Sequence, residues 1–208
     1  MAKRMVAIAL ILAAGTVLYG KSTKLITSWK NPDYSGPTFH KILVIGMSPN
    51  PGRRSDFEDA LSAQLNKPGQ QVIAGNQLLL RPDSKVDLEY IRQQIRENKI
   101  DAVIVSRLIS VKDSYTVVPG QVWTYPYPYY RSFYGYYGAV WPVVYTPGYT
   151  IEDKTVRVET TVYAATAPDG ELVWTATSDT FNPKSASKVI KDLTKLIAGE
   201  LRTVGVVS

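Results

Sequence analysis

The sequence contains no cysteine and only one histidine, His40. The lack of cysteine excludes disulfide bonds, thiolate catalysis, zinc–thiolate sites and lipid attachment through an N-terminal cysteine. A single histidine cannot form a histidine-rich metal site and supplies at most one member of a catalytic triad. His40 lies just before a predicted strand, so we expect it at the surface. The composition therefore predicts neither a metal nor another cofactor.

Strong charge is also lacking. The 24 Lys and Arg residues oppose 18 Asp and Glu residues, which gives a net charge of +6. Without Lys3 and Arg4, which lie in the N-terminal segment, the net charge falls to +4. A nucleic-acid-binding protein usually carries a dense stripe of Lys and Arg, and the sequence shows none. We therefore expect no nucleic-acid partner.

The residue patterns of common enzymes are missing. The loop Gly46–Arg54 follows a predicted strand but lacks Gly-Lys-Ser/Thr, which excludes a nucleotide-binding P-loop. Ser106 and Arg107 interrupt an apolar strand, and we expect Arg107 to reach a sheet edge or to pair with an acidic side chain. No spacing brings two carboxylates together as a glycosidase requires, so we expect a solvated face for Glu152, Asp153, Glu159 and Asp169. The sequence therefore predicts a protein that is not an enzyme.

One long uncharged run is present, Met5–Leu18, and it follows the basic residues Lys3 and Arg4. As a helix, its 14 residues would span about 21 Å, against roughly 30 Å for the core of a bilayer. Residues 1–20 are therefore predicted to be an export signal peptide, cleaved after Gly15 or Gly20, that sends the chain to the periplasm or the outer cell envelope. The alternative is an inner-membrane anchor formed by residues 5–19.

The rest of the chain predicts a single α+β domain over residues 40–208, after an irregular lead-in at 21–39. An apolar, β-branched run at the start of Asp101–Val118 is typical of a strand buried on both faces. Ser185–Arg202 has the apolar spacing of an amphipathic helix. The predicted order is β-α-β-α-β-[aromatic insert]-β-β-α, a two-layer sandwich with a mixed sheet of about five strands and three helices. The remaining strands are expected at 41–46, 70–74, 155–165 and 172–177, and the other helices from Ser55, with Glu58 completing a capping box, and from Asp87.

A tyrosine-rich insert at residues 119–150 is the most unusual segment. Trp123–Tyr149 holds nine of the 14 tyrosines, and no acidic residue occurs from Ser114 to Ile151. Tyrosine offers a large, half-polar surface at low rotamer cost, which suits contact with an envelope protein, a glycan or a lipid surface. The alternatives are that the insert covers its own sheet or is a poorly ordered loop. The predicted contact residues are Trp123, Tyr125, Tyr127, Tyr129, Tyr130, Arg131, Phe133, Tyr134, Tyr136, Tyr137 and Trp141.

Two arginines, Arg53 and Arg54, lie beside the predicted start of a helix, where positive charge is unfavourable by about 0.3–1 kcal/mol when exposed. An anionic ligand would relieve this cost, which makes the pair a weak candidate for anion binding. The alternative is charge pairing with the acidic residues of the next turn, Asp56, Glu58 and Asp59.

Four sequence segments together resemble a family of uncharacterised bacterial envelope lipoproteins. They are Ser28-Trp29-Lys30-Asn31-Pro32, Arg54-x-x-Phe57-Glu58, Asp101–Leu108, and Glu171-Leu-Val-Trp174-x-Ala176. The resemblance implies a small α/β domain similar to the amino-terminal domain of TolB and to the curli secretion lipoprotein. The chain departs from such lipoproteins at the signal, where Gly20 is followed by Lys21 in place of the acylated cysteine. A lipid anchor is therefore not implied.

The sequence as a whole favours a periplasmic or envelope-associated binding or accessory module that contacts a partner through the tyrosine-rich insert. The alternative is a structural subunit of a cell-envelope assembly, joined through the edge of the predicted C-terminal hairpin.

Overall fold

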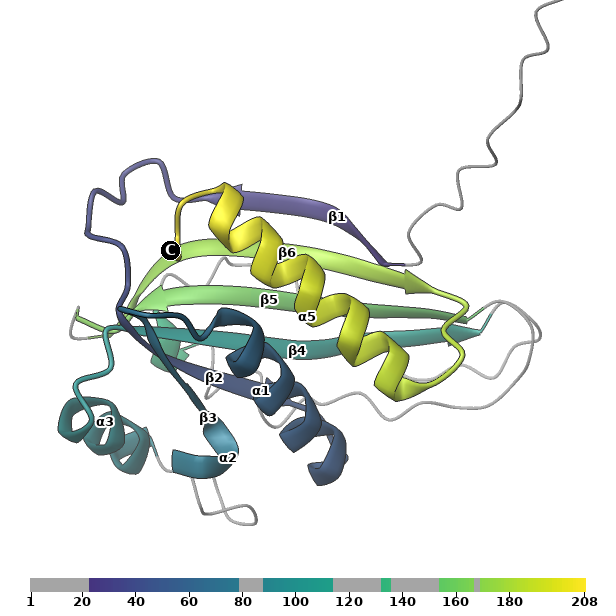
Figure 1. Cartoon of the computed structure of the whole chain (residues 1–208), viewed down its shortest axis with the longest axis horizontal. Helices are drawn as coiled ribbons and strands as arrows, with labels where there is room; N and C mark the ends of the chain where they lie inside the picture. Colours follow the sequence, from purple (N-terminus) through teal and green to yellow (C-terminus); the bar gives the residue numbers. More distant parts are fainter. Residues whose placement is uncertain (1–22, 79–87, 114–131, 136–153, 167–168) are drawn as a thin grey trace, which may run out of the picture.

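The computed structural model describes residues 23–78, 88–113, 132–135, 154–166 and 169–208. Within these residues the chain forms one mixed sheet with helices on both of its faces (Figure 1). The elements in chain order are β1 (Thr23–Lys30), β2 (Lys41–Met47), α1 (Pro51–Leu65), β3 (Gln71–Ala74), α2 (Gly75–Leu78), α3 (Leu88–Glu97), β4 (Ala102–Asp113), β5 (Lys154–Ala164), β6 (Glu171–Phe181) and α5 (Ala186–Thr203). Residues 133–135 add a short helical turn.

The sheet has six strands in the order β1-β6-β5-β4-β2-β3. Strands β3, β2 and β4 run parallel, because helical connections carry the chain from β2 to β3 and from β3 to β4. The pairs β4–β5, β5–β6 and β6–β1 are antiparallel. The fold is therefore α+β as expected, but the expected count of five strands is wrong.

The missed strand is β1, which lies within the segment expected to be an irregular lead-in. It pairs with β6 from Thr23↔Thr180 to Lys30↔Trp174, with a bulge around Ile26. Five successive residues of β1, from Ile26 to Lys30, are exposed, so the strand lacks the alternation that marks a half-buried strand. Its partner β6 lies far away along the chain, near the C-terminus. No local pattern in the sequence indicates this pairing.

Two cores lie on opposite faces of the sheet. Face 1 is covered by α1 and α5, which lie side by side across the strands (Figure 1), and Trp174 and Ile197 are fully buried there. Face 2 carries a second core in which Ile91 and Ile95 of α3 pack on Leu43 and Ile45 of β2. The predicted two-layer arrangement is therefore incomplete, because the parallel strands carry helices on both faces.

Helix α5 follows the sequence prediction closely. The hydroxyl of Ser185 caps it by accepting a hydrogen bond of 3.1 Å from the backbone N–H of Lys188. Its inner face buries Val189, Leu193, Ile197 and Leu201, and each such side chain contributes roughly 1.5–3 kcal/mol through burial.

Helix α1 begins earlier than the predicted cap at Ser55. Asn50 is the N-cap, and its side chain accepts a hydrogen bond of 3.0 Å from the backbone N–H of Arg53. Pro51 then occupies the first helical position, where its fixed φ suits the helix and its missing N–H has no partner to lose. The predicted capping box is therefore wrong, and Glu58 has a different role.

Candidate functional site

The structure describes two of the predicted contact residues, Phe133 and Tyr134. Phe133 is 1% exposed and belongs to the core of face 2, where its ring centroid lies 5.7 Å from that of Tyr163. Phe133 therefore packs in the core and presents no surface to a partner in this conformation. At this position the insert follows the alternative interpretation, in which it covers its own sheet. The other predicted contacts, which lie outside the described residues, are Trp123, Tyr125, Tyr127, Tyr129, Tyr130, Arg131, Tyr136, Tyr137 and Trp141.

Tyr134 is half-buried against α3. The guanidinium carbon of Arg92 lies 4.2 Å from the centre of the Tyr134 ring, a cation–π arrangement. Arg92 also donates a hydrogen bond of 2.7 Å to Glu89, which fixes its position above the ring. Burial raises the pKa of the Tyr134 hydroxyl, while the charge of Arg92 acts in the opposite direction. Tyr134 is therefore neutral at physiological pH and serves as a contact between the insert and α3.

The turn between β5 and β6 holds the middle of the insert. Ser132 donates a hydrogen bond of 2.7 Å to the backbone carbonyl of Asp169. Gly170 has a φ of +73°, and a Cβ atom there would lie 2.8 Å from the Cβ of Phe133. Both the backbone conformation and the close approach of Phe133 thus require glycine at this position.

The strands that lead into and out of the insert are paired at the opposite end of the sheet. Asp113, the last residue of β4, is paired with Lys154, the first residue of β5. Ala102 and Ala164 are paired at the other end of β4 and β5, near the turn that holds Phe133. The described residues therefore bracket the insert with the paired strand residues Asp113 and Lys154, and hold its middle, Ser132 to Tyr134, against face 2.

Partly buried ion pairs link neighbouring strands of the antiparallel part of the sheet. Arg107 donates a hydrogen bond of 3.1 Å to Glu159 across β4 and β5, which confirms the expected acidic partner for Arg107. Arg157 binds Asp179 through two hydrogen bonds of 2.7 Å each. Glu159 is 6% exposed, so its expected place on a solvated face is wrong. Because side chains alternate along a strand, Glu159 points to the same face of β5 as Tyr163, which is face 2.

Arg53 and Arg54, the candidate anion site, have different environments. Arg54 donates a hydrogen bond of 2.9 Å to Glu58, as the charge-pairing alternative predicted, while Arg53 is exposed. Glu58 is fully buried and also accepts hydrogen bonds from the backbone N–H groups of Gly46 and Asn76, at 2.9 and 2.6 Å. Burial raises the pKa of the Glu58 carboxyl, although these three hydrogen bonds and the charge of Arg54 oppose the change. Glu58 thereby joins α1 to the end of β2 and to α2, which follows β3.

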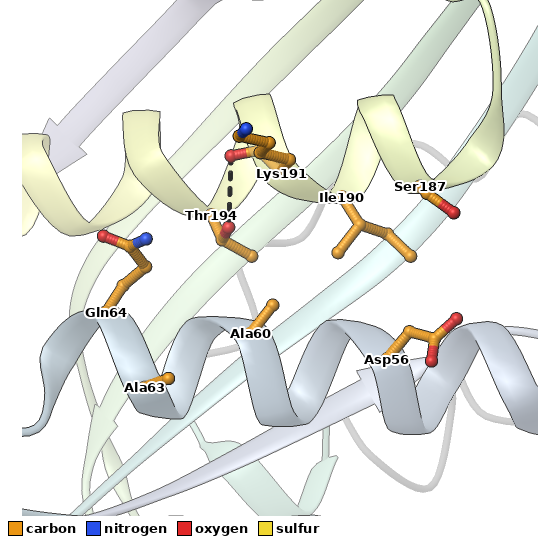
Figure 2. A pocket seen from close by; sticks show the side chains of 8 residues that line it. All are labelled: Asp56, Ala60, Ala63, Gln64, Ser187, Ile190, Lys191 and Thr194. Atoms are coloured by element: carbon orange, nitrogen blue, oxygen red, sulfur yellow. Dashed lines mark hydrogen bonds between the residues drawn. The ribbon is translucent and has the colours of Figure 1, made fainter.

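A shallow groove of about 390 Å³ lies between α1 and α5 on face 1 (Figure 2). Ala60 and Ile190 point toward one another across it from the two helices. Its full lining is Asp56, Ala60, Ala63, Gln64, Ser187, Ile190, Lys191 and Thr194. The groove is on the face opposite to Phe133, and no pattern in the sequence indicated it.

The described residues contain no group of three or more His, Asp or Glu side chains placed to hold a metal ion. Among the same residues, no helix combines the length and apolarity needed to cross a membrane. His40 is exposed, as expected, with Nδ1 lying 3.3 Å from the carbonyl oxygen of Gly69.

Comparison with known proteins gives weak likenesses only. No protein-family model and no curated protein matches the chain. Among solved structures, it is similar to the PelC dodecamer from Paraburkholderia phytofirmans, with a TM-score of 0.42, 16% identity, and coverage of 84% of this chain and 94% of that chain. It is also similar to lipoprotein GNA1162 from Neisseria meningitidis, with a TM-score of 0.41, 13% identity, and coverage of 79% and 99%. For hypothetical protein CT253 from Chlamydia trachomatis the TM-score is 0.33, the identity 9% and the coverage 82% and 94%. Likenesses of this size assign neither a family nor a function to the chain.

Proposed function

We propose that this chain is a non-enzymatic binding module of the bacterial cell envelope that contacts a partner protein through its tyrosine-rich insert, residues 119–150. The observation that carries the proposal is the way the scaffold holds this insert. Asp113 and Lys154, the described residues on either side of the insert, are paired on neighbouring strands, and Phe133 and Ser132 fasten its middle to the other end of the sheet. A segment fastened in this way loses less conformational entropy on binding than a free loop, which favours affinity.

The composition of the insert supports a protein partner. Its tyrosines supply wide contact area with few rotatable bonds, as they do in antibody binding loops. Arg131 is its only charge within Trp123–Tyr149, so recognition would depend on shape and hydrogen bonding more than on ionic contacts. The signal-like residues 1–20 support the envelope as the compartment.

The buried charges of the scaffold support a non-enzymatic role. Three carboxylates in the described residues are less than 10% exposed, and each accepts a hydrogen bond from an arginine. These pairs are Glu58 with Arg54, Glu159 with Arg107, and Asp179 with Arg157. A carboxylate engaged in this way holds the fold together and is poorly placed to exchange protons with a substrate.

The proposal is tested by photo-crosslinking in cells. A photo-reactive amino acid replaces Tyr127 or Tyr137 in the insert, and a control places it at Gln64, which is exposed on α1 of face 1. We expect a discrete protein adduct from the insert positions that is missing from the Gln64 control, and mass spectrometry would identify the partner. Adducts that are the same from all three positions, or none from the insert, would count against the proposal.

A second candidate, a structural subunit of an envelope assembly, is favoured by the outer edge of β1. The hairpin edge expected to serve as the joint is already occupied, because β6 pairs with β1 and β5 pairs with β4. Strand β1 is the edge strand on this side of the sheet instead, and its side chains Ile26 and Trp29 are 47% and 41% exposed. A mass that rises with concentration in light scattering, and falls when Ile26 is replaced by Lys, would favour this candidate.

A further inference from the structure

Exposed lysines gather at one end of the sheet. We call this end, where β1 and β5 begin and β4 and β6 finish, the lysine end (right side of Figure 1). Lys112 is paired with Thr155, Lys154 bonds Asn182 through the backbone, and Thr155 is paired with Phe181, so the strand ends lie together. The exposed lysines of the lysine end are Lys24, Lys112, Lys154, Lys184 and Lys188.

The acidic side chains described at the lysine end are fewer, and two of them are engaged in ion pairs. Asp179 is 4% exposed and binds Arg157 through both carboxylate oxygens. Asp192 pairs with Lys188 at 2.7 Å, and Asp113 is half-buried. The sequence adds Lys21 before β1 and the pair Glu152 and Asp153 before β5, all outside the described residues. Asp56 of α1 is also exposed nearby, in the groove that it lines together with Ser187. The exposed lysines still outnumber the acidic side chains, so the described part of the lysine end carries a net positive charge.

Exposed apolar side chains lie among these cations. Phe181 is 40% exposed, and the ammonium of Lys24 lies 5.9 Å from the centre of its ring. Ile26, at the bulge two residues further along β1, is 47% exposed. Apolar side chains surrounded by lysines match the boundary of a membrane, where rings and aliphatic groups enter the headgroup region and ammonium groups meet lipid phosphates.

The position of the uncharged run Met5–Leu18 in the sequence also favours a membrane at the lysine end. Only residues 19–22 separate the uncharged run Met5–Leu18 from the first residue of β1, Thr23. Four residues span at most about 14 Å. If the run stays in the membrane, it holds the lysine end close to the lipid surface. If a peptidase removes the run, a new α-amino group adds a further positive charge beside β1.

We propose that the lysine end binds the surface of an anionic phospholipid membrane. Exposed lysines near such a surface attract it within a Debye length of about 8–10 Å at moderate salt. The lysines that carry this proposal, Lys24, Lys154 and Lys184, lie outside the insert, so the vesicle experiment and the crosslinking experiment succeed or fail separately. With the lysine end on the membrane, the strands run away from the lipid and the turn that holds Phe133 lies at the far end.

The test measures binding of the full chain to vesicles of phosphatidylcholine with phosphatidylglycerol, and to vesicles of phosphatidylcholine alone. One variant carries Lys24→Gln, Lys154→Gln and Lys184→Gln. A matched control carries Lys67→Gln, Lys99→Gln and Lys195→Gln, three lysines that are exposed elsewhere on the molecule, so both variants lose the same charge. We expect the first variant to bind the anionic vesicles about a hundredfold more weakly than the wild type, because each surface lysine contributes roughly a fivefold factor.

The control variant is expected to bind within a few-fold of the wild type, and high salt is expected to weaken wild-type binding. If the two variants lose the same affinity for anionic vesicles, the overall charge of the protein explains the binding and the proposal is wrong. Equal wild-type binding to both vesicle types would also overturn the proposal.

A second measurement applies even if the apolar run inserts into every vesicle. Lys24, Lys154 and Lys184 should be protected from an amine-reactive reagent on anionic vesicles, and Lys67, Lys99 and Lys195 should not. Equal protection of the two sets would contradict the proposal.

Discussion

The ring of Phe133 packs against the ring of Tyr163, with centroids 5.7 Å apart. This contact joins the middle of the tyrosine-rich insert to β5, and it divides the insert into one anchoring point and two flanking stretches. Replacing Phe133 by Ala is expected to lower the free energy of unfolding by about 3–5 kcal/mol, because a fully buried ring leaves a cavity. Urea unfolding checks this value. The matched control is Phe181→Ala, whose exposed ring should cost less than about 1 kcal/mol, and similar losses in the two variants would contradict the assignment.

Replacing Gly170 by Ala is expected to destabilise the fold by about 1–3 kcal/mol. The new Cβ would strain a backbone with φ of +73° and press on Phe133. Gly199 in α5 offers the matched control, because a Cβ there would meet nothing within 4 Å. Gly199→Ala should raise stability by about 0.5–1 kcal/mol through helix propensity. Thermal unfolding should show a lower midpoint for Gly170→Ala and a higher midpoint for Gly199→Ala. Midpoints that shift in the same direction would refute the role of Gly170.

Replacing Glu58 by Gln is expected to alter how stability depends on pH. The folded-state pKa of Glu58 is raised above its ordinary value of 4.5, mainly by burial, so the folded chain holds the proton more tightly than the unfolded chain. The contribution of Glu58 to stability is therefore fully present below pH 4.5 and is lost as the pH rises through the folded-state pKa. The unfolding free energy of the wild type minus that of Glu58→Gln should therefore fall as the pH rises from 4.5 through the folded-state pKa of Glu58. A difference that grows with pH would show that the hydrogen bonds to Glu58 outweigh its burial.

The start of α1 can be located by comparing two caps. Asn50→Ala is expected to cost about 1 kcal/mol, because the backbone N–H of Arg53 loses its acceptor. Ser55→Ala is expected to be neutral or to stabilise by a few tenths of a kcal/mol, since Ser55 lies inside the helix, where Ala is the better helix former. Chemical denaturation measures both changes. A larger loss of stability for Ser55→Ala than for Asn50→Ala would show that Ser55 is the N-cap, as the sequence pattern indicated.

The elements that could be predicted from sequence are those with a strong local pattern. Such patterns are the apolar spacing of α5, the apolar runs of β2 and β4, and the turn residues between β5 and β6. Each can be recognised within a few neighbouring residues. The pairing of Arg107 with an acidic side chain could also be expected, because a charge inside an apolar strand needs a partner.

The features that could not be predicted depend on contacts between distant parts of the chain. Strand β1 exposes most of its side chains, so only its hydrogen bonds to β6 reveal it. The burial of Phe133 depends on Tyr163 and Gly170, while its sequence neighbours are largely of the same aromatic kind. Glu159 was misplaced because β5 is buried on both faces over most of its length, so alternation alone does not separate inside from outside.

The central claim is that the scaffold is stable by itself and presents the insert to a partner protein. The most direct measurement uses a variant in which Tyr125, Tyr127, Tyr129, Tyr130, Tyr136 and Tyr137 are each replaced by Ser, while Phe133 and Tyr134 are kept. Its thermal unfolding and its capture of the crosslinked partner from envelope extract are compared with those of the wild type. We expect unfolding to stay cooperative within a few degrees of the wild type while capture is lost. Retained capture, or loss of cooperative unfolding, would contradict the claim.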